Sequence, residues 1–371
     1  MDFKKAYEHY KDDTASEEER RLVEEEIEKF QLLSEHLDAE WEQPETTEIP
    51  QQDLKKVRKS LRKRNSLIVL TSLVLAAALL LGCVYVAIPA VEKLYWNPDE
   101  NTYNIQYCTD LDLSLTAYAE LFCPGLTLGI MSSTRTGFAT YELLIPYWDV
   151  AQGGKTNYAN ATLERGQLTL PRELLSTGPV NVFENACYPV YTMDEEFKQD
   201  TVETLSSLPD YIQVEAAVSF SEDMSMEQLL EFKEQLEEGC IVWVGIRNCP
   251  EDRQRFPLCG IAPFTGGYVI EELNEYYTNF DVHLSDLTAE ILESHFMTLL
   301  QYTRDQEVKN RAVCEEYFAG ASYCRDVMQY VEENGIYSYG AYIAGPSQMF
   351  LDLLDSGVAS QVWIQDAWID A

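Results

Sequence analysis

The chain has 371 residues, enough for about two domains. It carries 63 Asp and Glu residues against 27 Lys and Arg residues, which gives a net charge of −36. Phosphate repels such an acidic surface, so the composition argues against direct binding to nucleic acid and favours basic partners.

The charge is distributed unevenly along the chain. Residues 1–54 carry 18 acidic and 6 basic side chains, and residues 97–371 carry 44 acidic and 13 basic ones. Residues 55–64, by contrast, carry seven basic side chains and no acidic one. We therefore treat 1–54 as an acidic arm, 55–64 as a basic block and 97–371 as a separate acidic region.

A long amphipathic helix is predicted over residues 17–41 of the acidic arm. Ser16 and Glu19 have the spacing of a capping box, and the segment contains no Gly or Pro. Aromatic residues between positions 3 and 10 also have helical spacing. Apolar side chains recur at every third or fourth position of the long helix and form an apolar stripe: Leu22, Val23, Ile27, Phe30, Leu33 and Leu37.

One helix cannot bury this apolar stripe by itself. Three alternatives remain: the stripe packs on the short helix before it, pairs with a second copy, or docks in a groove of another protein. The glutamates beside the stripe favour a basic soluble partner over the negatively charged inner leaflet of a membrane.

Residues 65–90 are predicted to form a transmembrane helix. Leu67 to Ile88 are 22 residues without a charge, and about 20 helical residues cross a bilayer. Because basic side chains collect on the cytoplasmic side, residues 1–64 are expected inside the cell and 91–371 outside, with Tyr95 and Trp96 at the outer interface. The orienting residues, which are expected to lie on membrane lipid, are Lys55, Lys56, Arg58, Lys59, Arg62, Lys63 and Arg64.

The apolar segment has two other interpretations. A cleaved signal peptide does not fit, because some 65 largely polar residues precede the segment. The sequence from Leu80 to Cys83 resembles a bacterial lipobox, but the same long leader favours a simple thiol in a membrane helix.

The exterior region is predicted to have an α+β fold in two parts. Residues 97–200 are rich in Tyr, Thr, Leu and Val with frequent turn residues, so they are expected to be mainly β, with strands near 126–130, 138–145 and 181–183. Residues 210–371 contain two strand–helix–strand patterns, at 214–246 and 337–369, which predict an α/β sandwich. Longer helices are expected between them, at about 285–304 and 306–333.

No catalytic, metal-binding or cofactor-binding motif is found. Asp110 and Asp112 are expected on one side of an extended strand, without the glycine and terminal glutamate of a calcium loop. His283 and His295 lie twelve residues apart and lack partners at metal-binding spacing. We therefore expect binding or sensing and not an enzyme.

The cysteines are confined to the membrane segment and the exterior region, where eight of the nine lie. Cys249 and Cys259 bracket a proline-containing loop and are candidates for a disulfide, although buried thiols are the alternative. Cys314 and Cys324 would pair only if the helix breaks near Gly320, because ten helical residues span about 15 Å.

Several segments resemble one protein family. The order of acidic helix, basic block, single span and Tyr95-Trp-Asn-Pro98 is similar to membrane-bound sigma factor regulators of Gram-positive bacteria. Gln213 to Phe220, Ile241 to Val244 and Tyr339 to Gly345 resemble the C-terminal domain of that family, and Tyr118 to Gly125 with Thr136 to Glu142 resembles its juxtamembrane part. The arm lacks the cysteines of zinc-binding anti-sigma proteins, so metal-dependent redox sensing by the arm is not expected.

This resemblance implies a single-pass membrane anti-sigma factor. Its cytoplasmic residues 1–54 would hold an extracytoplasmic-function sigma factor, and its exterior region would respond to an envelope signal through a ligand that is not known. Two alternatives remain open: a membrane-anchored exterior binding or scaffold protein without a role in transcription, and an envelope enzyme.

Overall fold

The computed structural model describes most of the chain. The described residues are 3–12, 14–41, 51–149, 156–171, 174, 182–183, 194–209, 211–236, 239–250, 258–264, 270–306 and 321–369. They belong to two compact units, Met1–Gly82 and Cys83–Ala371, which we describe one at a time.

The first unit begins with two packed helices, α1 (Phe3–Lys11) and α2 (Glu17–Trp41). The predicted capping box is present at the start of α2: the Ser16 amide donates to Glu19 Oε2 at 2.9 Å, and the Glu19 amide donates to Ser16 Oγ at 3.3 Å. These hydrogen bonds lower the pKa of the Glu19 carboxyl, the backbone bond to Ser16 most strongly. The predicted helix over 17–41 is confirmed.

One continuous helical run, Lys55–Glu92, is long enough to cross a membrane and contains an 18-residue window with a mean hydropathy of 2.8. It comprises the end of α3 (Gln51–Gly82), a π-helical turn (Cys83–Ala87) and α4 (Ile88–Glu92). Pro89 at the start of α4 has no backbone N–H to donate to the preceding turn, which accounts for the π-helical turn just before it. The predicted membrane-spanning helix therefore exists as a helix of sufficient length.

After α4, the second unit continues with a helix that was not predicted from the sequence. Residues 110–122 form α5 (Asp110–Phe122), so the expectation of an extended strand at Asp110 and Asp112 was wrong. Thr109 and Asp112 form a reciprocal capping box, and Asp112 Oδ1 also accepts from the Met131 amide at 2.9 Å. Burial raises the pKa of the Asp112 carboxyl, and hydrogen bonds to Met131 and Thr109 oppose the rise. Both carboxylates have structural roles here.

The first sheet follows α5 and is antiparallel throughout. Its strands are β1 (Leu126–Leu128), β2 (Ser132–Gly137), β3 (Thr140–Asp149), β4 (Asn157–Glu164) and β5 (Gln167–Thr169), in the order β1-β3-β4-β5 with β2 also on β3. The predicted strands near 126–130 and 138–145 are thus present. Val182 and Phe183 are buried but lie outside any strand.

The second sheet contains β6 (Ile212–Ser225), β7 (Cys240–Ile246), β8 (Gly260–Ile261), β9 (Tyr337–Pro346) and β10 (Ala359–Ile369), in the order β10-β6-β9-β7-β8. Helix α7 (Met226–Gln235) joins β6 to β7, and α11 (Ser347–Asp355) joins β9 to β10. Each joined pair is separated by one antiparallel strand, so the two strand–helix–strand units interlock as in split β-α-β folds. Both predicted units are present, within an antiparallel sheet.

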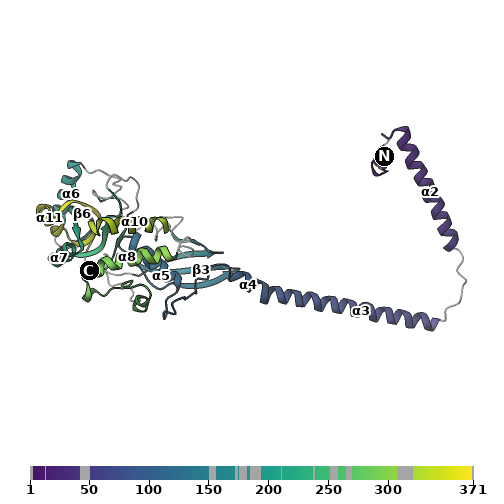
Figure 1. The fold of residues 1–371 in the computed structure, drawn as a ribbon, viewed down its shortest axis with the longest axis horizontal. Helices are drawn as coiled ribbons and strands as arrows, with labels where there is room; N and C mark the ends of the chain where they lie inside the picture. Colours follow the sequence, from purple (N-terminus) through teal and green to yellow (C-terminus); the bar gives the residue numbers. More distant parts are fainter. Residues whose placement is uncertain are drawn as a thin grey trace. The chain divides into compact units, whose positions relative to one another are not determined.

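The described part of the unit also contains helices α6 (Glu195–Ser207), α8 (Ala289–Asp305) and α10 (Ala321–Asn334), with short 3₁₀ turns at Glu271–Glu275 and Leu284–Asp286. Helix α8 packs on α5, α7 and α10, as Figure 1 shows. The expected helix over 306–333 is described only as α10, because residues 307–320 lie outside the described part. One hydrophobic core contains side chains from α5, from α8 and from both sheets.

Candidate functional site

The apolar stripe of the arm divides into a covered and an exposed part. Val23 is fully buried and Leu22 is half-buried, and α2 packs on α1. The side chains farther along remain open: the exposed fractions of Ile27, Phe30 and Leu33 are 39%, 73% and 58%. Leu37 lies in α2, but its side chain is outside the described part. Packing against α1 therefore accounts for the start of the stripe and leaves an apolar surface beyond it.

The basic block forms the first turns of the membrane-length helix. All seven predicted orienting side chains, from Lys55 to Arg64, are exposed on α3. No Asp or Glu interrupts them. Seven cations within ten residues, directly before an apolar segment, are the pattern expected for the cytoplasmic end of a membrane helix.

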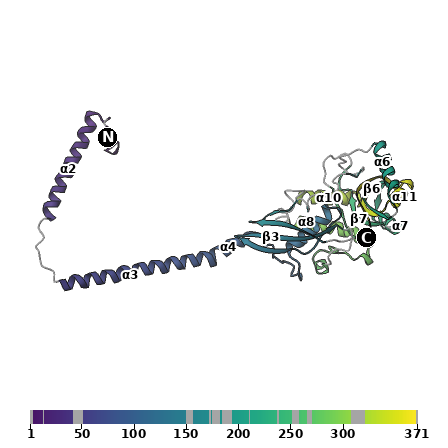
Figure 2. The same cartoon turned by 180° about the vertical axis from the view of Figure 1, so that it is seen from behind.

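At the other end of this helix, a β-hairpin holds the last turn of α4. Glu92 forms an ion pair with Arg135 and accepts the backbone N–H of Ala139 at 3.0 Å, both at the end of the β2–β3 hairpin. The Tyr95 and Phe138 rings make an edge contact at 5.9 Å. In both views of the molecule, Figure 1 and Figure 2, β3 runs toward α4. The helix end is therefore fastened to the first sheet.

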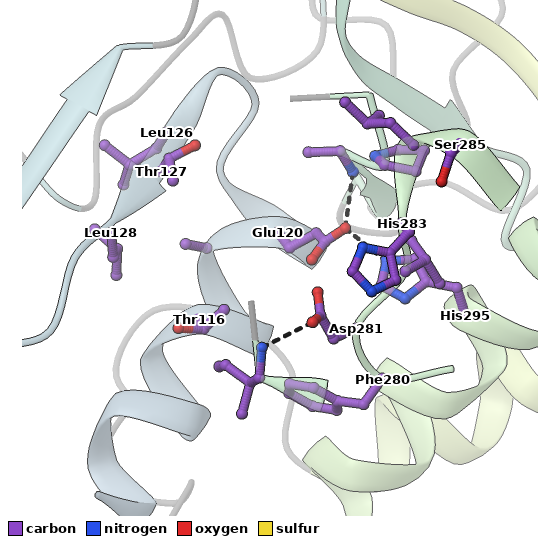
Figure 3. Close-up of a pocket in the computed structure, with 16 residues that line it drawn as sticks. Thr116, Glu120, Leu126, Thr127, Leu128, Phe280, Asp281, His283, Ser285 and His295 are labelled. Carbon is purple, nitrogen blue, oxygen red and sulfur yellow. Dashed lines mark hydrogen bonds and ion pairs between the residues drawn. The ribbon is translucent and has the colours of Figure 1, made fainter. Parts of the chain in front are cut away.

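A cavity of about 380 Å³ opens among α5, β1, β8 and the segment before α8. Figure 3 shows the carboxylates of Glu120 and Asp281 on the same side as the two histidines, with Leu126 and Leu128 of β1 on the other side. This volume lies in the usual range for small-molecule sites, and the mixture of apolar walls and few polar groups is typical of them.

His295 and Glu120 form a buried pair at the edge of this cavity. His295 Nε2 lies 2.7 Å from Glu120 Oε1, and Nδ1 lies 2.8 Å from the carbonyl oxygen of Asn279. A carbonyl oxygen only accepts, so Nδ1 carries a proton and donates to it. Burial alone would lower the pKa of His295, but Glu120 and the hydrogen bond to Asn279 outweigh it and leave the pKa raised.

The pair connects separate elements. Glu120 Oε1 also accepts the backbone N–H of Ala262, next to β8, at 3.1 Å. Glu120 comes from α5 and His295 from α8, so three segments far apart in the sequence meet at one carboxylate. The Glu120 carboxylate therefore links α5, α8 and the segment after β8.

Asp281 is the other carboxylate of the cavity. Its Oδ2 accepts the backbone N–H of Ile270 at 2.7 Å. Burial raises the pKa of Asp281, whereas the Ile270 hydrogen bond and the nearby His283 and His295 lower it. His283 itself lies 2.7 Å from Glu271 in an exposed pair. The described lining of the cavity contains no Lys or Arg.

Five of the described cysteines are buried, whereas Cys83 and Cys240 are exposed. Cys249 and Cys259 are buried thiols, so the disulfide expected between them is not formed in this structure. Burial raises the pKa of the Cys259 thiol well above its usual range. Burial also raises the pKa of the Cys324 thiol, to about 12. Such thiols are poor nucleophiles. Cys187 and Cys314 lie outside the described residues.

Sequence reasoning missed this cavity for a clear reason. Glu120 and His295 are 175 positions apart, and His283 and His295 lacked partners at any local spacing. No short motif therefore marks the site. The one signal available was a histidine in a strongly amphipathic helix, at a position that α8 buries.

Comparison with known proteins identifies the C-terminal half. The family profile described as sigma factor regulator C-terminal matches residues 205–362, from the end of α6 into β10. No curated protein and no solved structure matches the chain. The resemblance to the sigma factor regulators is confirmed over residues 205–362, and that family is regulatory and not catalytic. Residues 205–362 are therefore similar to the C-terminal domain of the sigma factor regulators.

Proposed function

We propose that this protein is a single-pass membrane anti-sigma factor. Its acidic arm, residues 1–54, holds an extracytoplasmic-function sigma factor in the cytoplasm, and its second unit responds to a signal outside the membrane. The match of residues 205–362 to the sigma factor regulators carries this proposal.

The exposed part of α2 supports a role in binding. Ile27, Phe30 and Leu33 lie on one side of a helix whose other positions are largely acidic. A DNA-binding protein presents basic surfaces, to which such a helix is complementary. An amphipathic helix with its apolar side in a groove is a common mode of recognition. Covering the surfaces that bind polymerase or promoter would keep the target genes off.

Co-purification tests the proposal. The full-length chain, tagged at its C-terminus, is extracted from its own cells in detergent, and the captured proteins are identified by mass spectrometry. We expect a sigma factor among them, and transcription from its promoters should rise when the chain is deleted. Truncated interface hot spots cost about 2 kcal/mol or more each. Replacing Ile27 and Phe30 by Asp should therefore reduce capture by more than about tenfold.

Leu32→Asp is the matched control. Leu32 is also exposed on α2, at 62%, but two positions from Phe30 correspond to about 200° around a helix. The control should retain the sigma factor. If the wild-type chain captures no sigma factor, or if the Ile27 and Phe30 double variant captures as much as Leu32→Asp does, the exposed side of α2 is not the binding surface. A chain that only pairs with itself would support a scaffold without a role in transcription.

A further inference from the structure

We propose that the cavity between α5 and the segment before α8 binds a small ammonium compound, one with an apolar body and a single positively charged nitrogen, and that Asp281 is its counter-ion. Neither the family match nor the sequence motifs assign a ligand to this site.

The charges around the cavity indicate the sign of the ligand's charge. Glu120 and His295 form a pair whose total charge is zero whether the shared proton lies on nitrogen or on oxygen. Among the described lining residues this leaves Asp281 as the carboxylate without a cationic hydrogen-bond partner, because its bond is to the neutral amide of Ile270. His283 also lines the cavity, but it is paired with Glu271 at 2.7 Å. With both histidines paired to glutamates, Asp281 leaves one net negative charge in a partly desolvated cavity, which favours a monocation and repels an anion.

The apolar side chains that line the cavity indicate that the rest of the ligand is apolar. Leu126 and Leu128 from β1, with Pro263 and Ile270, line the space across from or beside the carboxylates. A volume of about 380 Å³ admits a ring or a short chain together with its charged end. A bare metal ion is not favoured, because no group of three His, Cys, Asp or Glu side chains among the described residues is placed to hold one.

The rest of the region attracts such a ligand. Residues 97–371 carry 44 acidic and 13 basic side chains, so their field concentrates cations near the surface. Binding a cation also compensates the desolvation of Asp281, so it should lower the pKa that burial has raised. Affinity should then fall as the pH is lowered through the titration of Asp281. His283, His295 and Glu120 also act on that carboxylate.

The cavity is connected to the membrane helix. Its wall β1 pairs with β3 from Leu126 opposite Asp149 to Leu128 opposite Tyr147, and the β2–β3 hairpin holds Glu92 of α4. Use of the ligand as the exterior signal rests on the proposed function, whereas binding itself does not.

Binding is measured on the full-length chain in detergent by titration calorimetry. The probes are benzylammonium, its neutral isostere benzyl alcohol, and benzoate, at pH 7. Hydrogen bonds to charged groups are stronger than those between neutral groups. We therefore expect benzylammonium to bind at least about tenfold more tightly than benzyl alcohol, and benzoate not to bind. Equal affinity for the cation and the alcohol, or preference for benzoate, would overturn the proposal without bearing on the sigma factor.

Asp281→Asn locates the site. Asparagine keeps an oxygen that accepts the Ile270 amide, so the fold should be retained and can be checked by circular dichroism. The variant should lose the preference for the cation, whereas Asp355→Asn, at an exposed position of α11 outside the lining, should keep it. If Asp281→Asn folds and binds benzylammonium as the wild type does, the assignment of this cavity is wrong. If it does not fold, the wild-type comparison of cation with alcohol still decides.

Discussion

His295 and His283 make the same contact in opposite surroundings. In each, Nε2 lies 2.7 Å from a glutamate oxygen, Glu120 for His295 and Glu271 for His283. The His295 side chain is 2% exposed, whereas that of His283 is 49% exposed. Exposed ion pairs contribute about 0–1 kcal/mol, while breaking a buried one costs about 3–5 kcal/mol. Loss of the buried His295 pair should therefore cost more stability than loss of the exposed His283 pair, although the two distances are equal.

We predict that His295→Gln destabilises the second unit by about 3 kcal/mol or more and His283→Gln by less than about 1 kcal/mol. Loss of the imidazole leaves Glu120 without its charged donor, whereas water can replace His283. Urea unfolding of the detergent-solubilised chain, followed by near-UV circular dichroism, provides the measurement. Equal midpoints for the two variants would show that the Glu120 pair contributes no more than a surface pair.

The same residue predicts a pH dependence. The pKa of His295 is raised above 6.5 in the folded chain, so the folded state holds this proton more tightly than the unfolded state does. The contribution to stability is fully present below pH 6.5 and is lost as the pH rises through the raised pKa. Asp112 and Asp281 have raised pKa values as well, but their effect on the stability of the fold begins as soon as the pH rises above 3.8.

Unfolding curves between pH 6 and 8.5 test this expectation. The wild-type midpoint should fall across that interval, and the fall should be absent in His295→Gln and retained in His283→Gln. A flat wild-type profile would mean that the folded chain holds the proton of the His295–Glu120 pair no more tightly than the unfolded chain does.

Local signals predicted some elements well and others poorly. The limits of α2 follow from Ser16, Glu19 and a run without Gly or Pro, all of which act within a few residues. Helix α5 was missed although Thr109 and Asp112 have capping-box spacing, because their Leu- and Tyr-rich surroundings resemble a strand. The cavity could not be predicted, since its charged groups meet only after α5 and α8 pack together. Tertiary contacts therefore define the site, whereas local ones define the arm.

At the level of elements, the end of α4 and the β2–β3 hairpin should open together. Glu92 is 16% exposed and accepts from both Arg135 and the Ala139 amide. Hydrogen bonds to charged groups contribute about 1.5–3 kcal/mol, so Glu92→Ala should speed hydrogen exchange at the Ala139 amide by about tenfold or more. Exchange followed by mass spectrometry measures this.

Glu142→Ala is the control for this experiment, because Glu142 is exposed on β3. It should leave exchange at the end of the hairpin unchanged. Should Glu92→Ala show wild-type exchange there, the hairpin is held by the Tyr95–Phe138 contact or by its own strand pairing. In that case Glu92 would not couple the membrane helix to the first sheet.

For the whole molecule, the functional proposal requires a single orientation across the membrane. The seven cations of residues 55–64 precede the apolar segment, and Lys93 is the cation close beyond it. A green fluorescent protein fused to the N-terminus should therefore fluoresce, and an alkaline phosphatase fused to the C-terminus should be active.

Replacing the seven cations by Gln should reduce the phosphatase activity, because the remaining charge bias then favours the reverse orientation. The control replaces seven glutamates of α2 by Gln, since acidic residues contribute little to orientation. An inactive phosphatase on the wild-type chain would place the arm outside the cell, where no sigma factor can reach it.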